Sequence, residues 1–231
     1  MEGEMIAEMQ RVNPFLPLSD AVYEIILQEI ISFKFHPSSK INESNVAKLL
    51  KVSRSPVRDA LDRLDSKNYV TKVPGKGYFV SDFTKEEYLN ITDLAFMLEP
   101  YAAGEAAIRL TDADIDVLYG MAARLEQLFQ APNYKDLLDA ELNFHMFLIK
   151  KSNNPFVESI YEEMKYKIFR YRSYLMYKPT PDLFSIMTND HRVICDALRL
   201  RDRAIGKATL KRHLSISHRT YMESGFFNKR R

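Results

Sequence analysis

Residues 44–80 read SNVAKLLKVSRSPVRDALDRLDSKNYVTKVPGKGYFV. This stretch predicts a short helix, a turn, a second helix that opens at Ser53, and then a two-stranded hairpin. Val57, Leu61 and Leu64, at spacings of four and three, form the apolar stripe of the second helix. That order of elements indicates a winged helix-turn-helix with a small β-hairpin wing. The inner side of the first helix is expected to carry Val46, Ala47, Leu49 and Leu50.

The opposite face of the second helix carries Arg54, Ser55 and Arg58 in its first turns. These are the turns of a recognition helix that reach base edges, and arginine is the usual reader of guanine. Ser53 suits the N-cap, and the free amide groups of a helix start can receive a phosphate. The pattern therefore predicts binding of double-stranded DNA through Ser53, Arg54, Ser55 and Arg58.

Local charge supports this interpretation. Residues 48–76 contain eight Lys or Arg against three Asp, in a chain whose net charge is only +2. The hairpin tip holds Gly75 and Lys76, where glycine permits a close approach to the nucleic acid. The alternative is that these charges only form a solvated face, but their clustering beside the hairpin favours DNA.

The segment VSRSPVRDALDRLDSKNYV followed by PGKGYFV resembles the GntR family of bacterial transcription regulators. The resemblance implies that Ser53, Arg54, Ser55 and Arg58 contact operator DNA, and that Gly75 and Lys76 form the wing contact.

In the winged-helix region the chain departs from that family at three glycine positions. Phe33, Ser38 and Asn68 stand where glycine is usual. Asparagine can adopt the left-handed conformation, so the turn at Asn68 into the hairpin is expected to be kept.

Composition indicates a cytoplasmic protein without a membrane segment. Of the 231 residues 46% are hydrophobic and 28% charged, and no apolar run is long enough to cross a bilayer. The N-terminus is acidic, unlike a secretory signal. The single cysteine, Cys195, fits a reducing compartment and a place in the core rather than a nucleophile.

From residue 81 onward the pattern is helical throughout. The residues Thr84-Lys85-Glu86-Glu87 form a capping box at the start of the first helix. Six amphipathic helices are expected over about 84–110, 111–131, 134–151, 154–177, 182–200 and 202–224, which make an all-α bundle. The predicted fold class is therefore mainly α, with an N-terminal extension (1–18), a winged helix-turn-helix domain (19–82) and a helical domain (83–228).

Three histidines lie on the apolar faces of three bundle helices. These are His145, with Glu141 one turn before it, His191 and His213. Each could be a satisfied core residue, but an ionised Glu141 inside a bundle needs a cation or a donor. Three imidazoles and a carboxylate suit a divalent Zn, Ni, Mn or Fe ion.

The segments around Glu141…Phe144-His145, Asn154, His191-Arg192 and Arg212-His213 are similar to the FCD ligand-binding domain of the FadR branch of the same family. The resemblance implies a divalent metal held by Glu141, His145, His191 and His213. It also implies a small-molecule effector, an organic or sugar acid. The family usually has Asp where this chain has Glu141.

An effector acid would need a cationic partner. Members of the family often carry an arginine near the position of Ala95, which this chain lacks. Arg170 or Arg172 could replace it, and Arg172 is the candidate effector-binding residue.

These observations predict a transcription regulator, not an enzyme, that binds operator DNA as a homodimer and responds to an effector. Two alternatives stay open. One is a metal-dependent hydrolase or lyase with Glu141 as general base. The other is a regulator whose metal is purely structural.

Overall fold

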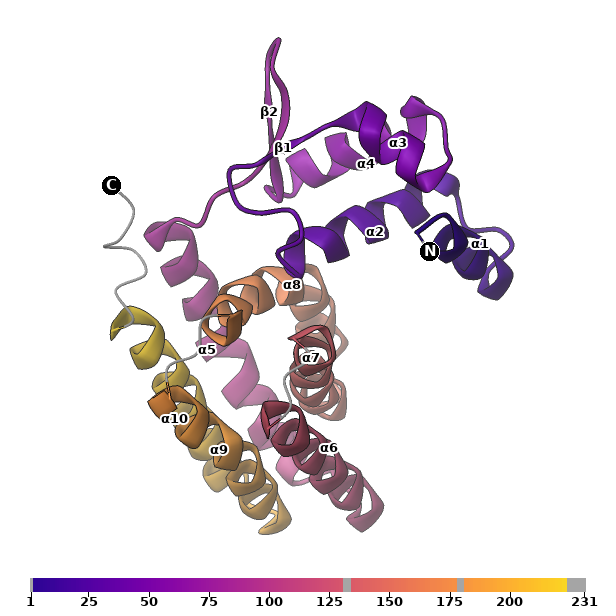
Figure 1. Cartoon of the computed structure of the whole chain (residues 1–231). Coiled ribbons are helices and arrows are strands. Elements are labelled where there is room, and N and C mark those ends of the chain that lie inside the picture. Colours follow the sequence, from indigo (N-terminus) through magenta and orange to yellow (C-terminus); the bar gives the residue numbers. More distant parts are fainter. Residues whose placement is uncertain (1, 131–133, 178–180, 224–231) are drawn as a thin grey trace. The chain divides into compact units, whose positions relative to one another are not determined.

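The computed structural model describes residues 2–130, 134–177 and 181–223, without the side chains of 2–5, 134–135, 138, 172–177 and 181–189. The chain divides into two compact units, Met1–Phe83 and Thr84–Arg231 (Figure 1). Helices dominate both units, and the described strands all lie in the first one. This confirms the predicted mainly-α class with a small β wing.

The first unit contains four helices, of which α4 packs against both α2 and α3. They are α1 (Glu2–Val12), α2 (Leu18–Ile31), α3 (Glu43–Leu50) and α4 (Arg54–Ser66). The stripe of α4 is buried as predicted, with Val57, Leu61 and Leu64 at 0% exposure. The prediction for Leu49 is wrong: its side chain is 56% exposed, because α3 turns only Val46, Ala47 and Leu50 inward.

The wing is a three-stranded antiparallel sheet. Strands β2 (Val70–Val73) and β3 (Gly77–Val80) form the predicted hairpin, in which Val73 pairs with Gly77. A two-residue strand, β1 (Lys40–Ile41), adds to the other edge of β3 and gives the order β1-β3-β2. A strand of this length has no periodicity to detect, so the sequence predicts only the hairpin.

Four non-glycine residues in the described part of the first unit adopt the left-handed conformation, one of which is Lys51 at the C-cap of α3. Phe33, Ser38 and Asn68 have φ angles of 61°, 64° and 60°. The prediction for Asn68 is confirmed. Phe33 and Ser38 adopt the same conformation, which carries a steric cost for residues with a Cβ atom.

The second unit consists of six helices. They are α5 (Lys85–Ala107), α6 (Asp112–Gln130), α7 (Tyr134–Lys151), α8 (Pro155–Tyr177), α9 (Pro181–Arg199) and α10 (Arg203–Glu223). The side chain of Thr84 caps α5 by accepting a hydrogen bond from the amide of Glu87 at 3.0 Å. Pro100 lies inside α5 without ending it. Cys195 is fully buried in the core of this unit, as expected.

Helices α5 and α10 pack side by side along their lengths (Figure 1). Near the C-terminal end of α5 the two backbones come very close. A Cβ atom on Gly104 would lie 2.9 Å from the carbonyl oxygen of Arg203, and one on Gly206 would lie 3.0 Å from that of Ala103. Both positions therefore require glycine.

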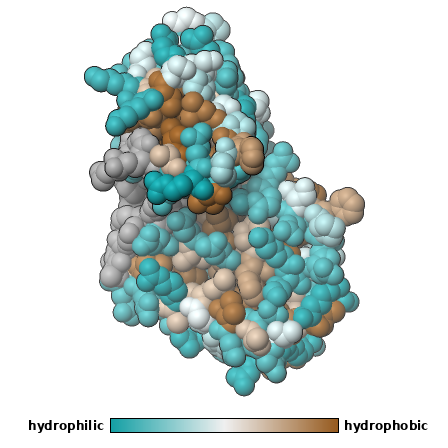
Figure 2. Space-filling view, turned by 90° about the vertical axis from the view of Figure 1, so that its right-hand side faces the viewer, coloured by the Kyte–Doolittle hydropathy of each residue, from teal (hydrophilic) through white to brown (hydrophobic). Residues whose placement is uncertain are grey.

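None of the helices in the described part of the chain is long and apolar enough to cross a membrane. Hydrophilic residues cover much of the face shown in Figure 2, and hydrophobic residues gather in a patch in the upper part of this view.

Candidate nucleic-acid interface and candidate metal centre

The first turns of α4 expose the predicted DNA-contact residues. Ser53, Arg54, Ser55 and Arg58 are all exposed, and the arginine side chains are 59% and 55% accessible. Ser53 occupies the N-cap position in an extended conformation, but its side chain makes no capping hydrogen bond. Its hydroxyl is therefore not engaged in capping α4.

Glu43, at the start of α3, orders both arginines. Its Oε2 atom accepts hydrogen bonds from Nε and a terminal nitrogen of Arg58 at 3.3 and 3.2 Å, and from Arg54 at 3.5 Å. Partly exposed ion pairs add little to stability. Glu43 therefore serves to orient the arginines and competes with any phosphate for them. Nothing in the sequence pattern linked Glu43 to these arginines.

The wing tip is exposed, but the strands just below it are bound to α4. Gly75 and Lys76 are exposed at the tip, and Gly75 has a φ angle of 72°. Lys72 and Tyr78 pair with each other next to the closing pair Val73–Gly77, and Asp62 of α4 accepts hydrogen bonds from the Tyr78 hydroxyl and from Lys72, both at 2.6 Å. The bonds from Lys72 and Tyr78 lower the pKa of Asp62. The wing is thus tied to α4 close to the turn, while Gly75 and Lys76 are open to solvent.

The second unit brings together the four predicted metal ligands. Glu141 and His145 come from α7, His191 from α9 and His213 from α10, and their exposures are only 2%, 1%, 1% and 6%. One ring nitrogen of each histidine lies within 4.8 Å of those of the other two. Oε2 of Glu141 is 3.6 Å from Nε2 of His145 and 3.3 Å from Nε2 of His191.

Two further carboxylates orient the histidines from outside the cluster. Oε2 of Glu99 on α5 lies 2.7 Å from Nδ1 of His145, and Oδ2 of Asp190 lies 2.6 Å from Nδ1 of His213. The other oxygen of Glu99 accepts a hydrogen bond from the Tyr161 hydroxyl at 3.0 Å. A carboxylate on Nδ1 is the usual outer partner of a metal-binding histidine, because it directs Nε2 toward the metal.

Sequence reasoning missed Glu99 and Asp190. The only available signal for Glu99 was an acid in an alanine-rich helix face next to Pro100, and Asp190 simply precedes His191. Neither position could be linked to a particular histidine without the fold.

Electrostatics within the cluster favour a neutral His213 and an ionised Glu141. Burial lowers the pKa of His213 to about 4, although Asp190 acts in the opposite direction. Burial also raises the pKa of Glu141, but the neighbouring imidazoles of His191 and His145 outweigh this effect. The carboxyl pKa is consequently held well below its usual value.

Several buried polar atoms in the cluster lack a hydrogen bond. Among the described residues, neither Oε1 of Glu141 nor either ring nitrogen of His191 has a partner with hydrogen-bond geometry. Leaving buried polar groups unsatisfied is costly, and native proteins rarely do so. Carboxylate and imidazole atoms gathered in this way fit a divalent cation.

The candidate effector residue cannot be placed. The side chain of Arg172 lies outside the described residues. Its neighbour Arg170 is buried, with 4% exposure.

Both units of the chain match protein-family models. Residues 90–215 match the FCD domain model, and residues 18–80 match the model for bacterial regulatory proteins of the gntR family. The Nta operon transcriptional regulator of Aminobacter aminovorans is 31% identical over 140 residues, which are 59% of this chain and 66% of that protein. The HTH-type transcriptional repressor RspR of Escherichia coli K12 is 24% identical over 91% of each chain.

A solved structure has the same fold. The E. coli protein McbR/YncC superposes with a TM-score of 0.79 at 20% identity, over 91% of this chain and 99% of that one. The FCD match alone spans more than half of the chain.

Proposed function

Because this chain belongs to the GntR family of DNA-binding transcription regulators and carries an FCD domain, we propose that a small molecule bound in the FCD domain controls its affinity for operator DNA. The proteins with which it compares are regulators, so the enzymatic alternative is dropped. The effector that we propose is a small organic or sugar acid held near a divalent metal.

The proposed DNA contacts follow from exposure and position. The amide end of α4 and the hydroxyls of Ser53 and Ser55 would hold phosphates, while Arg54 and Arg58 would read base edges in the major groove. Gly75 and Lys76 at the wing tip would contact the adjacent backbone or minor groove. A single such unit reads only a few base pairs, so the active species would be a homodimer on a two-fold operator.

The observation that carries the metal proposal is the buried set of three histidines and Glu141, with polar atoms that no described residue satisfies. These four residues would hold the ion, and Glu99 and Asp190 would keep the rings of His145 and His213 oriented. A bound ion would supply positive charge for an acidic effector. A purely structural metal is the alternative.

Regulation would follow from the distribution of the four ligands over three helices. Effector binding that favours one arrangement of α7, α9 and α10 would shift the protein toward that arrangement. The shift is limited by the difference in effector affinity between the two states.

The experiment is elemental analysis by mass spectrometry of tag-free protein purified without chelators. We expect about one metal ion per chain in the wild type, none in His191→Ala, and an unchanged content in His36→Ala. His36 is exposed in the first unit and is the matched control. Absence of metal even after incubation with Zn, Ni and Mn would overturn the metal site. Release of operator DNA by a small acid in the metal-loaded protein would separate a sensory from a structural metal.

A further inference from the structure

The carboxylate of Glu43 binds one particular edge of the Arg58 guanidinium group. Nε and Nη2 of Arg58 both donate a hydrogen bond to Oε2 of Glu43, at 3.3 and 3.2 Å. A guanidinium group has five N–H donors in a fixed plane, and it can present a pair of them along its side or along its end. Glu43 takes the side edge, formed by Nε and Nη2. The end edge, formed by the two terminal nitrogens, is left for a ligand.

Glu43 is more buried than the arginines that it binds. Its side chain is 17% accessible, whereas those of Arg54 and Arg58 are 59% and 55% accessible. Arg54 donates to the same oxygen of Glu43 at 3.5 Å. DNA that reaches this surface therefore meets the guanidinium groups before it meets the carboxylate.

A second acid lies on the same side of α4. Asp62 follows Arg58 by one helical turn, so the two side chains share a face. The hydrogen bond from Lys72 is the largest cause of the lowered pKa of Asp62, and the charge of Arg58 also contributes to it. Arg58 therefore lies in the field of two carboxylates, of which Glu43 is the one that it contacts.

A guanine base and a phosphate group interact differently with an arginine that is already paired. The major-groove edge of guanine offers two uncharged acceptors, O6 and N7, which match the two N–H bonds on the free edge of Arg58. A phosphate carries a full negative charge, so repulsion from Glu43 opposes its approach. The paired arginine consequently keeps its attraction for guanine and loses part of its attraction for phosphate.

We propose that Glu43 is a specificity-determining residue of the DNA interface, which orients Arg58 toward guanine and weakens its binding to phosphate. The inference rests on the proposed DNA contacts of α4. Contacts with phosphate carry no sequence information and dominate non-specific binding. A group that repels the wrong partner raises specificity even when it adds nothing to the affinity for the right one. Glu43 thus limits binding to the large excess of non-operator DNA.

Two DNA probes separate these contributions. The wild type first selects duplexes from a random-sequence library, and the selected sequence serves as the specific probe. A duplex of A·T pairs alone, which contains no guanine, reports binding through phosphates. Fluorescence anisotropy gives the affinity of each protein for both labelled duplexes. Glu43→Gln removes the charge but keeps the length of the side chain. Glu29→Gln, which removes a carboxylate paired with Lys34 on α2, is the matched control.

We expect Glu43→Gln to bind the A·T duplex about three- to fivefold more tightly than the wild type, the strength of a partly exposed ion pair. Its own selection from the library should show a weaker preference for guanine. The gain should disappear in the double variant Glu43→Gln/Arg58→Ala, which assigns it to Arg58. Glu29→Gln should behave like the wild type. Misfolding lowers the affinity for both duplexes, so it cannot produce this gain.

Unchanged or weaker binding of the A·T duplex by Glu43→Gln, an equal gain in Glu29→Gln, or a gain that persists in the double variant would each overturn the proposal and leave the DNA contacts in place. Absence of guanine from the sequence that the wild type selects would do the same. Loss of a cytosine preference in Glu43→Gln would show instead that Glu43 reads a base itself. A wild type that binds no DNA would overturn the proposed function as well.

Discussion

The two units of this regulator hold their polar functional groups in opposite settings. In the first unit the side chains of Arg54 and Arg58 are more than half exposed and lie outside the core. In the second, His145 and His191 are 1% exposed and pack among core residues. Phe144, for example, meets the ring of His191 edge-on at 4.8 Å.

In the first unit, the exposed groups can act in binding without contributing to stability. In the second unit, the buried groups contribute both to binding and to stability. An exposed arginine contributes little to folding, so its removal should change only the affinity for DNA. A buried ionisable group is part of the packing, so its protonation state should change the stability of the bundle. The following experiments test whether the contrast holds.

The largest effect should be a loss of stability when the metal-free protein is acidified. The pKa of His213 is about 4 in the folded state against 6.5 ordinarily, so the unfolded chain binds the proton more readily between these values. The free energy of unfolding should therefore fall by about 3 kcal/mol as the pH drops from 6.5 to 4. Urea unfolding of chelator-treated protein across this range measures it. His213→Asn should flatten the slope, and an equal slope in that variant would refute the assignment.

Removing the exposed arginines should have the next largest effect, a loss of affinity for DNA. The stability of the protein should not change. Arg54→Ala and Arg58→Ala should each weaken operator binding by about 1–3 kcal/mol, as expected for base-reading arginines. Fluorescence anisotropy with labelled operator DNA measures the loss, and thermal unfolding checks the fold. Arg63→Ala removes the same charge from a later turn of α4. Unchanged affinity in both variants would remove the DNA-contact assignment.

Disturbing the outer partner of a histidine should act on metal affinity. Glu99→Gln replaces the carboxylate beside Nδ1 of His145 and should weaken metal binding by about 10–100-fold. A competition titration with a chromogenic chelator gives the affinity. Glu105→Gln, on the same helix but paired with Arg109 and Arg203 rather than with a histidine, is the control. Equal affinities in the two variants would mean that Glu99 is only a packing residue.

A smaller effect is expected where the first unit carries backbone strain. Ser38→Gly should raise the free energy of unfolding by about 1 kcal/mol, since its φ angle of 64° disfavours a Cβ atom. Ser39→Gly, at the next position with ordinary backbone angles, should lower it. A denaturant titration compares the two, and stabilisation by both or by neither would argue against strain at Ser38.

Periodic patterns in the sequence predicted the helices well. The range 134–151 expected from apolar spacing is that of α7, and the Thr84 cap forms as expected. Asn68 adopts the left-handed conformation that its side chain tolerates. Local chemistry determines features of this kind, so they can be read without the fold.

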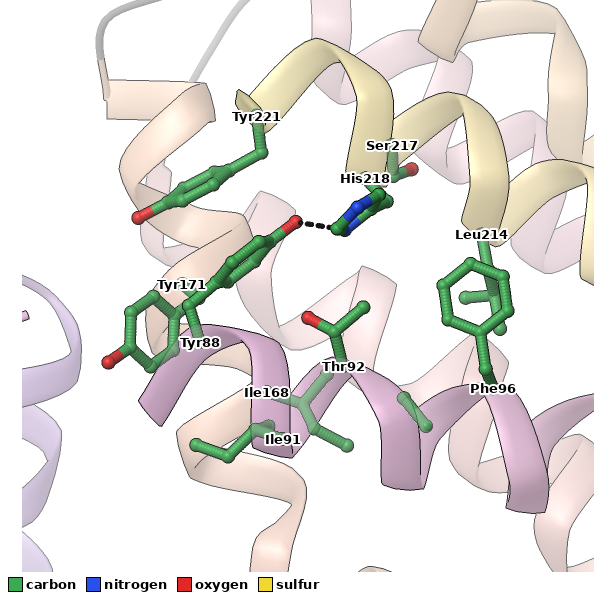
Figure 3. A pocket seen from close by; sticks show the side chains of 11 residues that line it. Tyr88, Ile91, Thr92, Phe96, Ile168, Tyr171, Leu214, Ser217, His218 and Tyr221 are labelled. Atoms are coloured by element: carbon green, nitrogen blue, oxygen red, sulfur yellow. Dashed lines mark hydrogen bonds between the residues drawn. The ribbon is translucent and has the colours of Figure 1, made fainter. Parts of the chain in front are cut away.

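Features that depend on contacts between distant residues could not be predicted. Glu99 and His145 are 46 positions apart, and only the packing of α5 on α7 brings them together. Leu49 illustrates the same limit, because a short helix offers too few turns to decide which side faces the core. A cavity lined by Tyr88, Tyr171 and Tyr221 is formed by three helices, α5, α8 and α10 (Figure 3). The sequence shows only tyrosines that are far apart, which do not predict a cavity.

The close contact of α5 with α10 gives this pair of helices a mechanical asymmetry. At Gly104 and Gly206 each helix lies so close to a backbone carbonyl oxygen of the other that there is no room for a Cβ atom. At the other end, rings and a cavity separate the two helices. If the two helices move apart, they should therefore rotate about the contact at the glycines. A small change at the cavity would then displace the first turn of α5 further than the turns nearer to the glycines.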